Sequence, residues 1–223
     1  MAEIVDVYID GAAIGNGLPF PDSGAGIGVW FGDNDERNFN CSVTKSDCNV
    51  MSMCRHVSEH TQTNQRAEIQ AAQSAITIAI QEEIFALRIH TDSKYVLDGI
   101  TSHIRKWKGN GWINARGKPV ANKGDWVNLD TEIAHFESHG GTLQWEYVEA
   151  HSGNYGNDQA DKLAKWAAKA SYDYNQFIAA SKCPESCCGC PGGDATDSEQ
   201  QRLAELERKM FESRKKTSLQ DLM

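Results

Sequence analysis

The feature that most constrains the fold is the order in which strand-like and helix-like segments follow one another. Three short apolar segments with strand character come first, and segments with small or apolar residues at every third or fourth position then alternate with two further strand-like segments. This βββαβα…αβα order predicts an α/β protein with a mixed sheet and helices on its faces. The expected strands are Ile4–Ile9, Ala25–Phe31, Asn38–Val43, Phe85–His90 and Thr142–Glu149, and the expected helices are Asn64–Glu83, one that begins after Ser93 as its N-cap, Trp126–His139 and Gly156–Lys169.

The composition is that of a folded protein, with 40% hydrophobic and 24% charged residues. The longest nearly apolar run, Ala75–Ile80, is far shorter than the ~20 residues that a membrane span needs. The N-terminus carries acidic residues where a signal or transit peptide would carry Lys or Arg. We therefore expect no membrane partner and an intracellular location, nuclear or cytoplasmic.

Most of the periodic signal lies in residues 1–170, which predicts one folded domain that would hold any catalytic site. Residues 171–223 are expected to form a flexible C-terminal tail. The tail combines a linker that contains cysteines with a short amphipathic helix, Gln200–Arg214, which could bind a protein partner or self-associate. The four cysteines within Cys183–Cys190 lack the paired spacing of structural zinc sites, so a reduced tail is favoured over a zinc site. A second metal site is an alternative, because the polar insertion at residues 46–60 contributes Cys and His residues in addition to Cys41. The candidate ligands are Cys41, Cys48, Cys54, His56 and His60.

Charge is distributed unevenly along the chain. The net charge of −9 argues against a simple nucleic-acid binder, yet residues 104–124 hold six basic residues and no acid, with Trp107 and Trp112 among them. One interpretation is a solvated loop with two core tryptophans. The other is a surface for a phosphate backbone with aromatic rings for stacking.

Several acidic residues lie at positions in the predicted strands and helices from which they could contribute to an active site. Asp10 and Asp92 each follow a predicted strand, where side chains at the sheet edge can converge on a cleft, although each alone is typical of a turn or helix cap. Glu68 lies near the start of one predicted helix and Asp161 lies on the last. Asp158, three residues before Asp161 on a similar helix face, is an alternative to it.

Four motifs in order carry a resemblance to a known family. They are Tyr8-Ile9-Asp10-Gly11, Thr63-Asn64-Gln65-Arg66-Ala67-Glu68, Thr91-Asp92-Ser93-Lys94-Tyr95, and His151-Ser152-Gly153 followed by Gly156-Asn157 and Ala160-Asp161. Over about residues 3–170 the chain resembles the cellular type 1 ribonucleases H. The basic stretch, with Trp107-Lys108 and Asn122-Lys123, matches the protrusion of that family. The resemblance implies a ribonuclease H-like fold, a five-stranded mixed sheet with helices on both faces.

The resemblance also implies an activity, hydrolysis of the RNA strand of RNA–DNA hybrids to give 5′-phosphate and 3′-hydroxyl ends. Asp10, Glu68, Asp92 and Asp161 would bind two Mg²⁺ ions, with Mn²⁺ able to substitute, because hard cations take oxygen ligands. The motif match favours Asp161 over Asp158. His151 would relay protons or assist product release from a loop.

Substrate contacts follow from the same resemblance. Asn16, Asn64 and Gln65 would read 2′-hydroxyl groups, because amides both donate and accept hydrogen bonds. Thr63 and Asn122 would bind a DNA phosphate, and Trp107 would stack on a DNA sugar beside Lys108; the alternative for each amide is loop or cap chemistry. His103 stands where many family members have a tryptophan.

A different class of function also fits this fold. A non-catalytic module that binds hybrids or double-stranded RNA would be expected to lack at least one acid, and all four are present. A third hypothesis is an interaction protein that acts through its tail.

Overall fold

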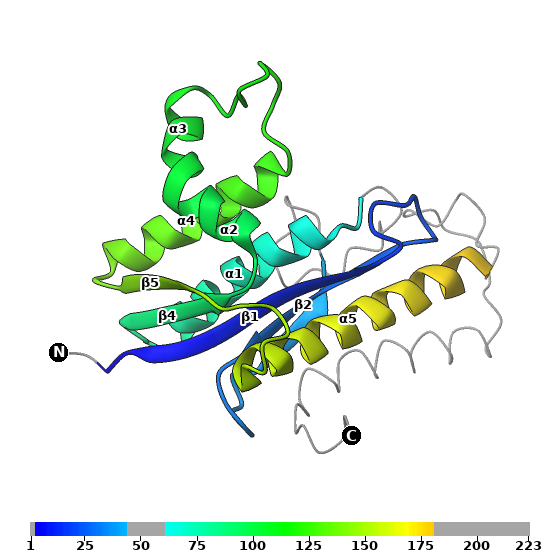
Figure 1. The fold of residues 1–223 in the computed structure, drawn as a ribbon, viewed down its shortest axis with the longest axis horizontal. Helices are drawn as coiled ribbons and strands as arrows, with labels where there is room; N and C mark the ends of the chain where they lie inside the picture. The colour runs from blue at the N-terminus through cyan, green and yellow to red at the C-terminus, as the bar shows by residue number, and fades with distance from the viewer. Residues whose placement is uncertain (1–2, 44–60, 181–223) are drawn as a thin grey trace, which may run out of the picture.

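The computed structural model describes residues 3–43 and 61–180. Five strands form one sheet in the order β3-β2-β1-β4-β5 (Figure 1). Strand β2 is antiparallel to both β1 and β3, whereas β4 is parallel to β1 and β5 is parallel to β4. The predicted mixed sheet is confirmed, with strand bounds Val5–Ile14 (β1), Gly24–Trp30 (β2), Phe39–Ser42 (β3), Ala86–Thr91 (β4) and Thr142–Tyr147 (β5).

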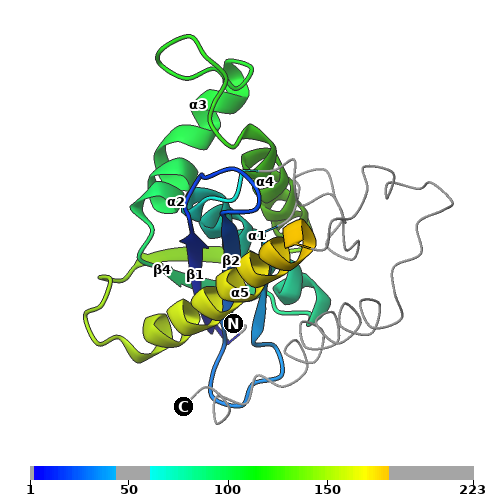
Figure 2. The ribbon, with the colours of Figure 1, turned by 90° about the vertical axis from the view of Figure 1, so that its right-hand side faces the viewer.

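Helices cover both faces of the sheet, as predicted. Helix α5 crosses β1, β2 and β3 on one face, and α1 packs on the other face with α4 behind it (Figure 2). Between β4 and α4 the chain forms two short helices joined by a π-helical turn. The helical bounds are Asn64–Gln81 (α1), Lys94–Asp98 (α2), Gly99–His103 (η2), Ile104–Gly109 (α3), Lys123–Ser138 (α4) and Tyr155–Ala180 (α5).

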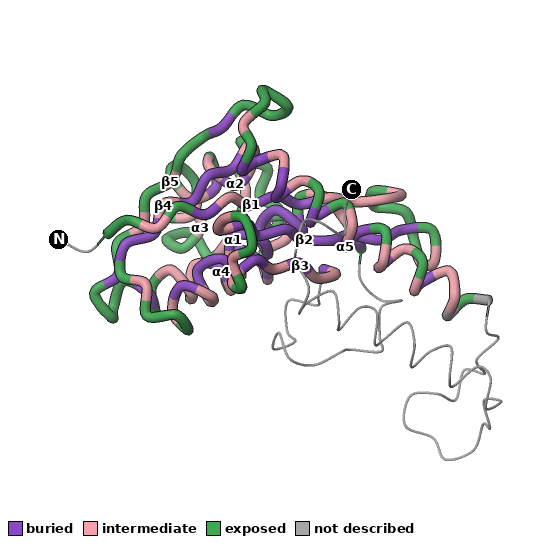
Figure 3. Tube along the Cα trace, turned by 90° about the horizontal axis from the view of Figure 1, so that it is seen from below, coloured by how far each residue is buried: buried purple, intermediate pink, exposed green. Residues whose placement is uncertain are grey.

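The main core lies between the sheet and α1. Buried residues gather along the central strands and on the helix faces that cover them (Figure 3). Alternate residues of β1, Val7 and Ile9, point into this core with Ile69 and Ile76 of α1. This leaves the other face of β1, which includes Tyr8 and Asp10, on the side of α5.

Helix α5 packs unusually close to β2. A Cβ atom on Gly26 would lie 2.2 Å from the backbone nitrogen of Ala168, so any larger residue would push the helix away. The helix meets β2 with alanines, Ala160, Ala164 and Ala167 among them, which permits this approach. The acids of α5 are thereby held at a short distance from β1.

Helix α5 is longer than the apolar periodicity predicted, because it ends at Ala180 instead of Lys169. Its last turns are held by polar contacts. Ser171 and Asn175 are buried, and Asn175 Nδ2 donates a hydrogen bond of 2.6 Å to the carbonyl of Ser23. A pattern search for apolar residues could not detect such an interface.

Several predictions fall outside the described residues: the insertion at residues 46–60, the Cys183–Cys190 group and the helix Gln200–Arg214. Of the second Cys/His group only Cys41 lies within the described residues, where it is half-buried in β3. Within residues 3–43 and 61–180, no helix has the length and hydropathy required to cross a bilayer.

Candidate active site

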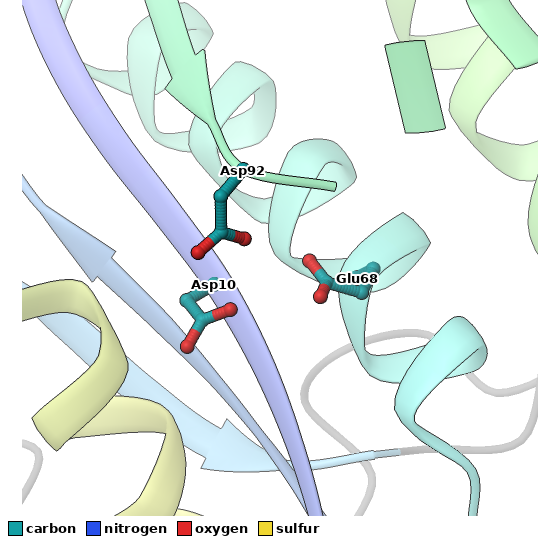
Figure 4. Close-up of side chains that lie close together, drawn as sticks. All are labelled: Asp10, Glu68 and Asp92. Carbon is teal, nitrogen blue, oxygen red and sulfur yellow. The ribbon is translucent and has the colours of Figure 1, made fainter. Parts of the chain in front are cut away.

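Three of the predicted acids meet at the centre of the sheet. Asp10 comes from β1, Asp92 directly follows the neighbouring parallel strand β4, and Glu68 projects from α1 (Figure 4). One carboxylate oxygen from each lies within 4.8 Å of those of the other two. Three residues far apart in sequence thus form one acidic cluster.

The prediction that Asp10 ends its strand is wrong. Strand β1 continues to Ile14, and Asp10 pairs with Gly28 in its middle. Gly11 is needed for close packing and not for a turn, because a Cβ atom there would lie 2.4 Å from the backbone nitrogen of Glu68. The missing side chain lets α1 approach β1, which brings Glu68 to Asp10.

Burial and the repulsion of neighbouring charges raise the pKa values of Asp10 and Glu68. Desolvation, followed by the charges of Asp92 and Asp161, raises the pKa of Asp10 from 3.8 to about 8. Burial and the charges of Asp10 and Asp92 raise the pKa of Glu68 well above its ordinary value. The cluster therefore favours either bound protons or a cation in their place.

The donor set fits a hard divalent cation. All three ligands are carboxylates, the oxygen donors that such ions prefer. Glu68 Oε2 is buried and finds no hydrogen-bond partner among the described residues. An unpartnered buried oxygen is costly unless another group satisfies it, and a metal ion would do so.

Asp161 adjoins this cluster without being one of its three members. Its charge and a hydrogen bond between the two carboxyl groups both raise the pKa of Asp10. Lys165, one helical turn further on, forms an ion pair of 2.7 Å with Asp161. Asp158 lies in the first turn of α5. The hydrogen bond from Lys165 to Asp161 raises the pKa of Lys165, and the charge of Asp158 adds to this effect.

Asn157 holds Asp92 in place, a role that the sequence interpretation missed. Its side chain is only 2% exposed, and its Nδ2 donates a hydrogen bond of 2.9 Å to Asp92 Oδ2. The spacing gave a signal, because Asn157 and Asp161 are four residues apart and share one face of α5. In the sequence, Asn157 stands out only as part of the Gly156-Asn157 motif.

The structure places His151 in the exposed loop between β5 and α5, with a positive φ of 54°. It is not one of the residues whose ligand atoms cluster. Its assignment therefore still rests on the motif alone.

The residues predicted to read 2′-hydroxyl groups lie beside the acids. The backbone N–H of Asn64 donates to Asn16 Oδ1 at 3.0 Å, and Asn64 Nδ2 donates to Glu68 Oε1 at 3.3 Å. Gln65 is exposed in the same turn. Thr63 is the N-cap of α1, and its hydroxyl accepts the N–H of Arg66.

A buried ion pair joins this turn to the start of α4. Arg66 donates to both carboxylate oxygens of Asp125, at 2.7 and 3.2 Å, and Gln70 donates to the same group at 2.7 Å. Asn122 precedes α4 in a left-handed conformation, and its Nδ2 donates to Tyr95 Oη at 3.3 Å. The helix that carries Thr63 is thereby tied to the one that Asn122 begins.

The basic stretch forms a protrusion on α3 and the following loop (Figure 1). All six of its basic side chains are exposed, as the surface interpretation requires: Arg105, Lys106, Lys108, Arg116, Lys118 and Lys123. Trp107 is half-buried, with its ring 5.5 Å from that of Trp126, so the core interpretation also holds for this residue in part. Lys108 forms an ion pair of 2.8 Å with Asp130 of α4.

Comparisons with known proteins agree with this geometry. The family model described as RNase H matches residues 2–169. The rat protein named Ribonuclease H1 is 39% identical over 171 residues, which cover 77% of this chain and 52% of the rat protein. Ribonuclease H of Parvibaculum lavamentivorans is 36% identical over 163 residues, which cover 73% of this chain and 91% of that protein. The chain thus spans about half the length of the matched mammalian protein.

Solved structures support the fold. LC9-RNase H1, described as a type 1 RNase H, aligns with a TM-score of 0.54 and 22% identity over 97% of this chain and 87% of its own. The PFV RNase H domain aligns with a TM-score of 0.53 and 21% identity over 74% of this chain and 94% of its own. With the family match over most of the described residues, the chain belongs to the RNase H family.

Proposed function

We propose that this protein is a metal-dependent endonuclease that hydrolyses the RNA strand of RNA–DNA hybrids. The observation that carries the proposal is the buried cluster of Asp10, Glu68 and Asp92 directly beside Asn64, which donates a hydrogen bond to Glu68. The nearby amide supports the proposal, because an amide beside the acids could hydrogen-bond a ribose 2′-hydroxyl. The names of the matched relatives support the same activity.

The acids would hold two Mg²⁺ ions, for which Mn²⁺ could substitute. Asp161 would be the fourth ligand, supported by its contact with Asp10. When bound, such ions activate a water molecule and stabilise the charge that develops on the phosphate and the leaving oxygen. The products would carry 5′-phosphate and 3′-hydroxyl ends.

The protein's own residues orient the cluster and the substrate. Asn157 fixes the rotamer of Asp92, and the N–H of Asn64 fixes the amide of Asn16, leaving the Nδ2 group of Asn16 for a ribose. His151, exposed on its loop, would exchange protons with the product phosphate.

The DNA strand would lie across the protrusion. Thr63 and Asn122 would bind one phosphate through the hydroxyl proton and the amide, and the buried pair of Arg66 and Asp125 fixes the spacing of their two helices. Trp107 would offer the exposed part of its ring to a deoxyribose, with Lys108 near the backbone. His103, whose ring lies 5.4 Å from that of Trp107, extends this surface.

Cleavage of labelled substrates tests the proposal. We expect the protein to cut a uniform RNA–DNA hybrid in the presence of Mg²⁺ or Mn²⁺ and to leave duplex DNA intact. Binding of the hybrid without cleavage across a full metal titration, with folding confirmed, would instead identify a non-catalytic binding module.

A further inference from the structure

The loop that carries Asn16 is fastened at both ends of its span. It joins β1 to β2 as residues 15–23, and Asn16 is exposed near its start. On the side of α1, the N–H of Gly17 donates to the carbonyl of Gln62 at 2.8 Å, and Asn16 accepts the N–H of Asn64 at 3.0 Å. These contacts bring Asn16 to the turn that holds Asn64.

The other attachment comes from the last turns of α5. Asn175 donates to the carbonyl of Ser23 at 2.6 Å, and Gln176 donates to the carbonyl of Pro21 at 3.0 Å and to Asp22 Oδ1 at 3.3 Å. Asn175 is only 1% exposed. Three consecutive residues of the loop are thus bound by two consecutive residues of a helix more than 150 positions away in sequence.

The packing around these contacts leaves little room for another loop position. A Cβ atom on Gly24, where β2 begins, would lie 2.4 Å from the backbone nitrogen of Tyr172 in α5. The end of α5 lies beside the loop in the ribbon view as well (Figure 1). The loop is therefore held between the start of α1 and the end of α5.

We propose that Asn175 and Gln176 are positioning residues that hold Asn16 where it binds the RNA strand. The inference rests on the proposed function, in which Asn16 reads a 2′-hydroxyl. Neither residue touches the acids, so their loss would weaken substrate binding and leave the chemical step nearly intact. The end of α5, which extends beyond the predicted helix, would then be part of the substrate-binding apparatus.

Steady-state kinetics with the Gln176→Ala variant tests this role. Because a lost hydrogen bond of this kind changes affinity by about threefold to tenfold, KM for the hybrid should rise by that factor while kcat stays within about twofold. Gln176→Lys keeps an N–H donor for Pro21 and adds a charge opposite Asp22, so it should restore KM. Asp173→Ala is the matched control, because Asp173 is exposed in the same turn and pairs only with Lys169 among the contacts described.

A double variant shows whether the effect passes through Asn16. Asn16→Ala alone should raise KM, and adding Gln176→Ala should then raise it by less than about twofold, because both changes remove the same contact. Effects that multiply in full would overturn the inference. So would an unchanged KM in Gln176→Ala.

Hydrogen exchange separates this inference from the proposed function. In the absence of metal and substrate, amides of residues 15–23 should exchange faster in Gln176→Ala and in Asn175→Ala than in the wild type or Asp173→Ala. Unchanged exchange would overturn the inference even if the enzyme cuts hybrids. If the wild type cuts no hybrid but the two variants still exchange faster than it does, the proposed function is refuted while the attachment of the loop to α5 is supported.

Discussion

Asp158 and Asp161 are identical side chains three residues apart, yet their surroundings differ. Asp161 contacts Asp10 and raises its pKa, whereas Asp158 acts on Lys165 from the first turn of α5. An acid in a first turn stabilises a helix by a few tenths of a kcal/mol through the helix dipole. The same residue type therefore has two separable roles on one helix.

Single substitutions should distinguish these roles. Asp161→Ala should lower the cleavage rate by more than about tenfold and raise the metal concentration needed, and Asp158→Ala should lower the rate by less than about threefold. Asp10→Ala, with near-complete loss expected, is the reference. Cleavage assays with hybrid at saturating metal measure all three, and the reverse ranking would place the fourth ligand at Asp158.

Asn157 should affect metal binding more than catalysis at saturating metal. Without its hydrogen bond, Asp92 is free to adopt other rotamers, so Asn157→Ala should raise the Mg²⁺ concentration at half-maximal rate by about tenfold. A metal titration of the cleavage rate measures this effect. The control is Asn154→Ala, which removes a cap of α5 near Asn157 without touching Asp92. Equal midpoints for the two variants would show that Asn157 acts only through stability.

At the scale of elements, the protrusion combines packing and charge. Trp107 packs near Trp126 and Trp112, so Trp107→Ala should lower the free energy of unfolding by about 1–3 kcal/mol in addition to any effect on binding. Lys108 is exposed, and its partner Asp130 competes with a phosphate for its charge. Lys108 is thus the better residue for measuring the contribution of the protrusion to binding.

Salt dependence should reveal this contribution. Lys108→Ala should weaken hybrid binding and reduce the slope of log affinity against log salt by about one, as expected for one lost phosphate contact. Asp130→Ala should leave the slope unchanged or steeper, because it frees Lys108. Fluorescence anisotropy at several salt concentrations measures both. An unchanged slope in Lys108→Ala would mean that the protrusion is a solvated loop.

The sequence predicted the elements with apolar periodicity and missed what depends on contacts between distant segments. The strands near Ile9 and Val29 and the start of α1 lie where the apolar runs and the helical spacing of small residues predict them. By contrast, the extension of β1 to Ile14 comes with its pairing to β2, and Gly11 within it permits the close approach of α1. The motifs predict that the acids lie together in one site, as Asp10, Glu68 and Asp92 do. The hydrogen bond from Asn157 to Asp92 depends on how α5 packs and is visible only in the structure.

At the scale of the whole molecule, the acidic cluster opposes folding when no cation is bound. Asp10 has a pKa of about 8 in the folded protein and an ordinary value of 3.8. Between these values the folded state keeps a proton that the unfolded chain has released, so a rise in pH favours unfolding. The stability associated with protonated Asp10 is present below pH 3.8 and is lost as the pH rises through about 8.

Comparison of the wild type with Asp10→Asn isolates this effect, because Asn does not titrate. In EDTA, the free energy of unfolding of the wild type should fall relative to that of the variant as the pH is raised from about 5 to 8, by up to about 1.4 kcal/mol per pH unit. Urea unfolding at each pH measures the difference. Adding Mg²⁺ at pH 8 should stabilise the wild type more than Asp10→Asn, because the ion replaces the proton at the cluster. A difference between the two proteins that stays constant with pH would show that Asp10 ionises normally and that the cluster needs no cation to remain folded.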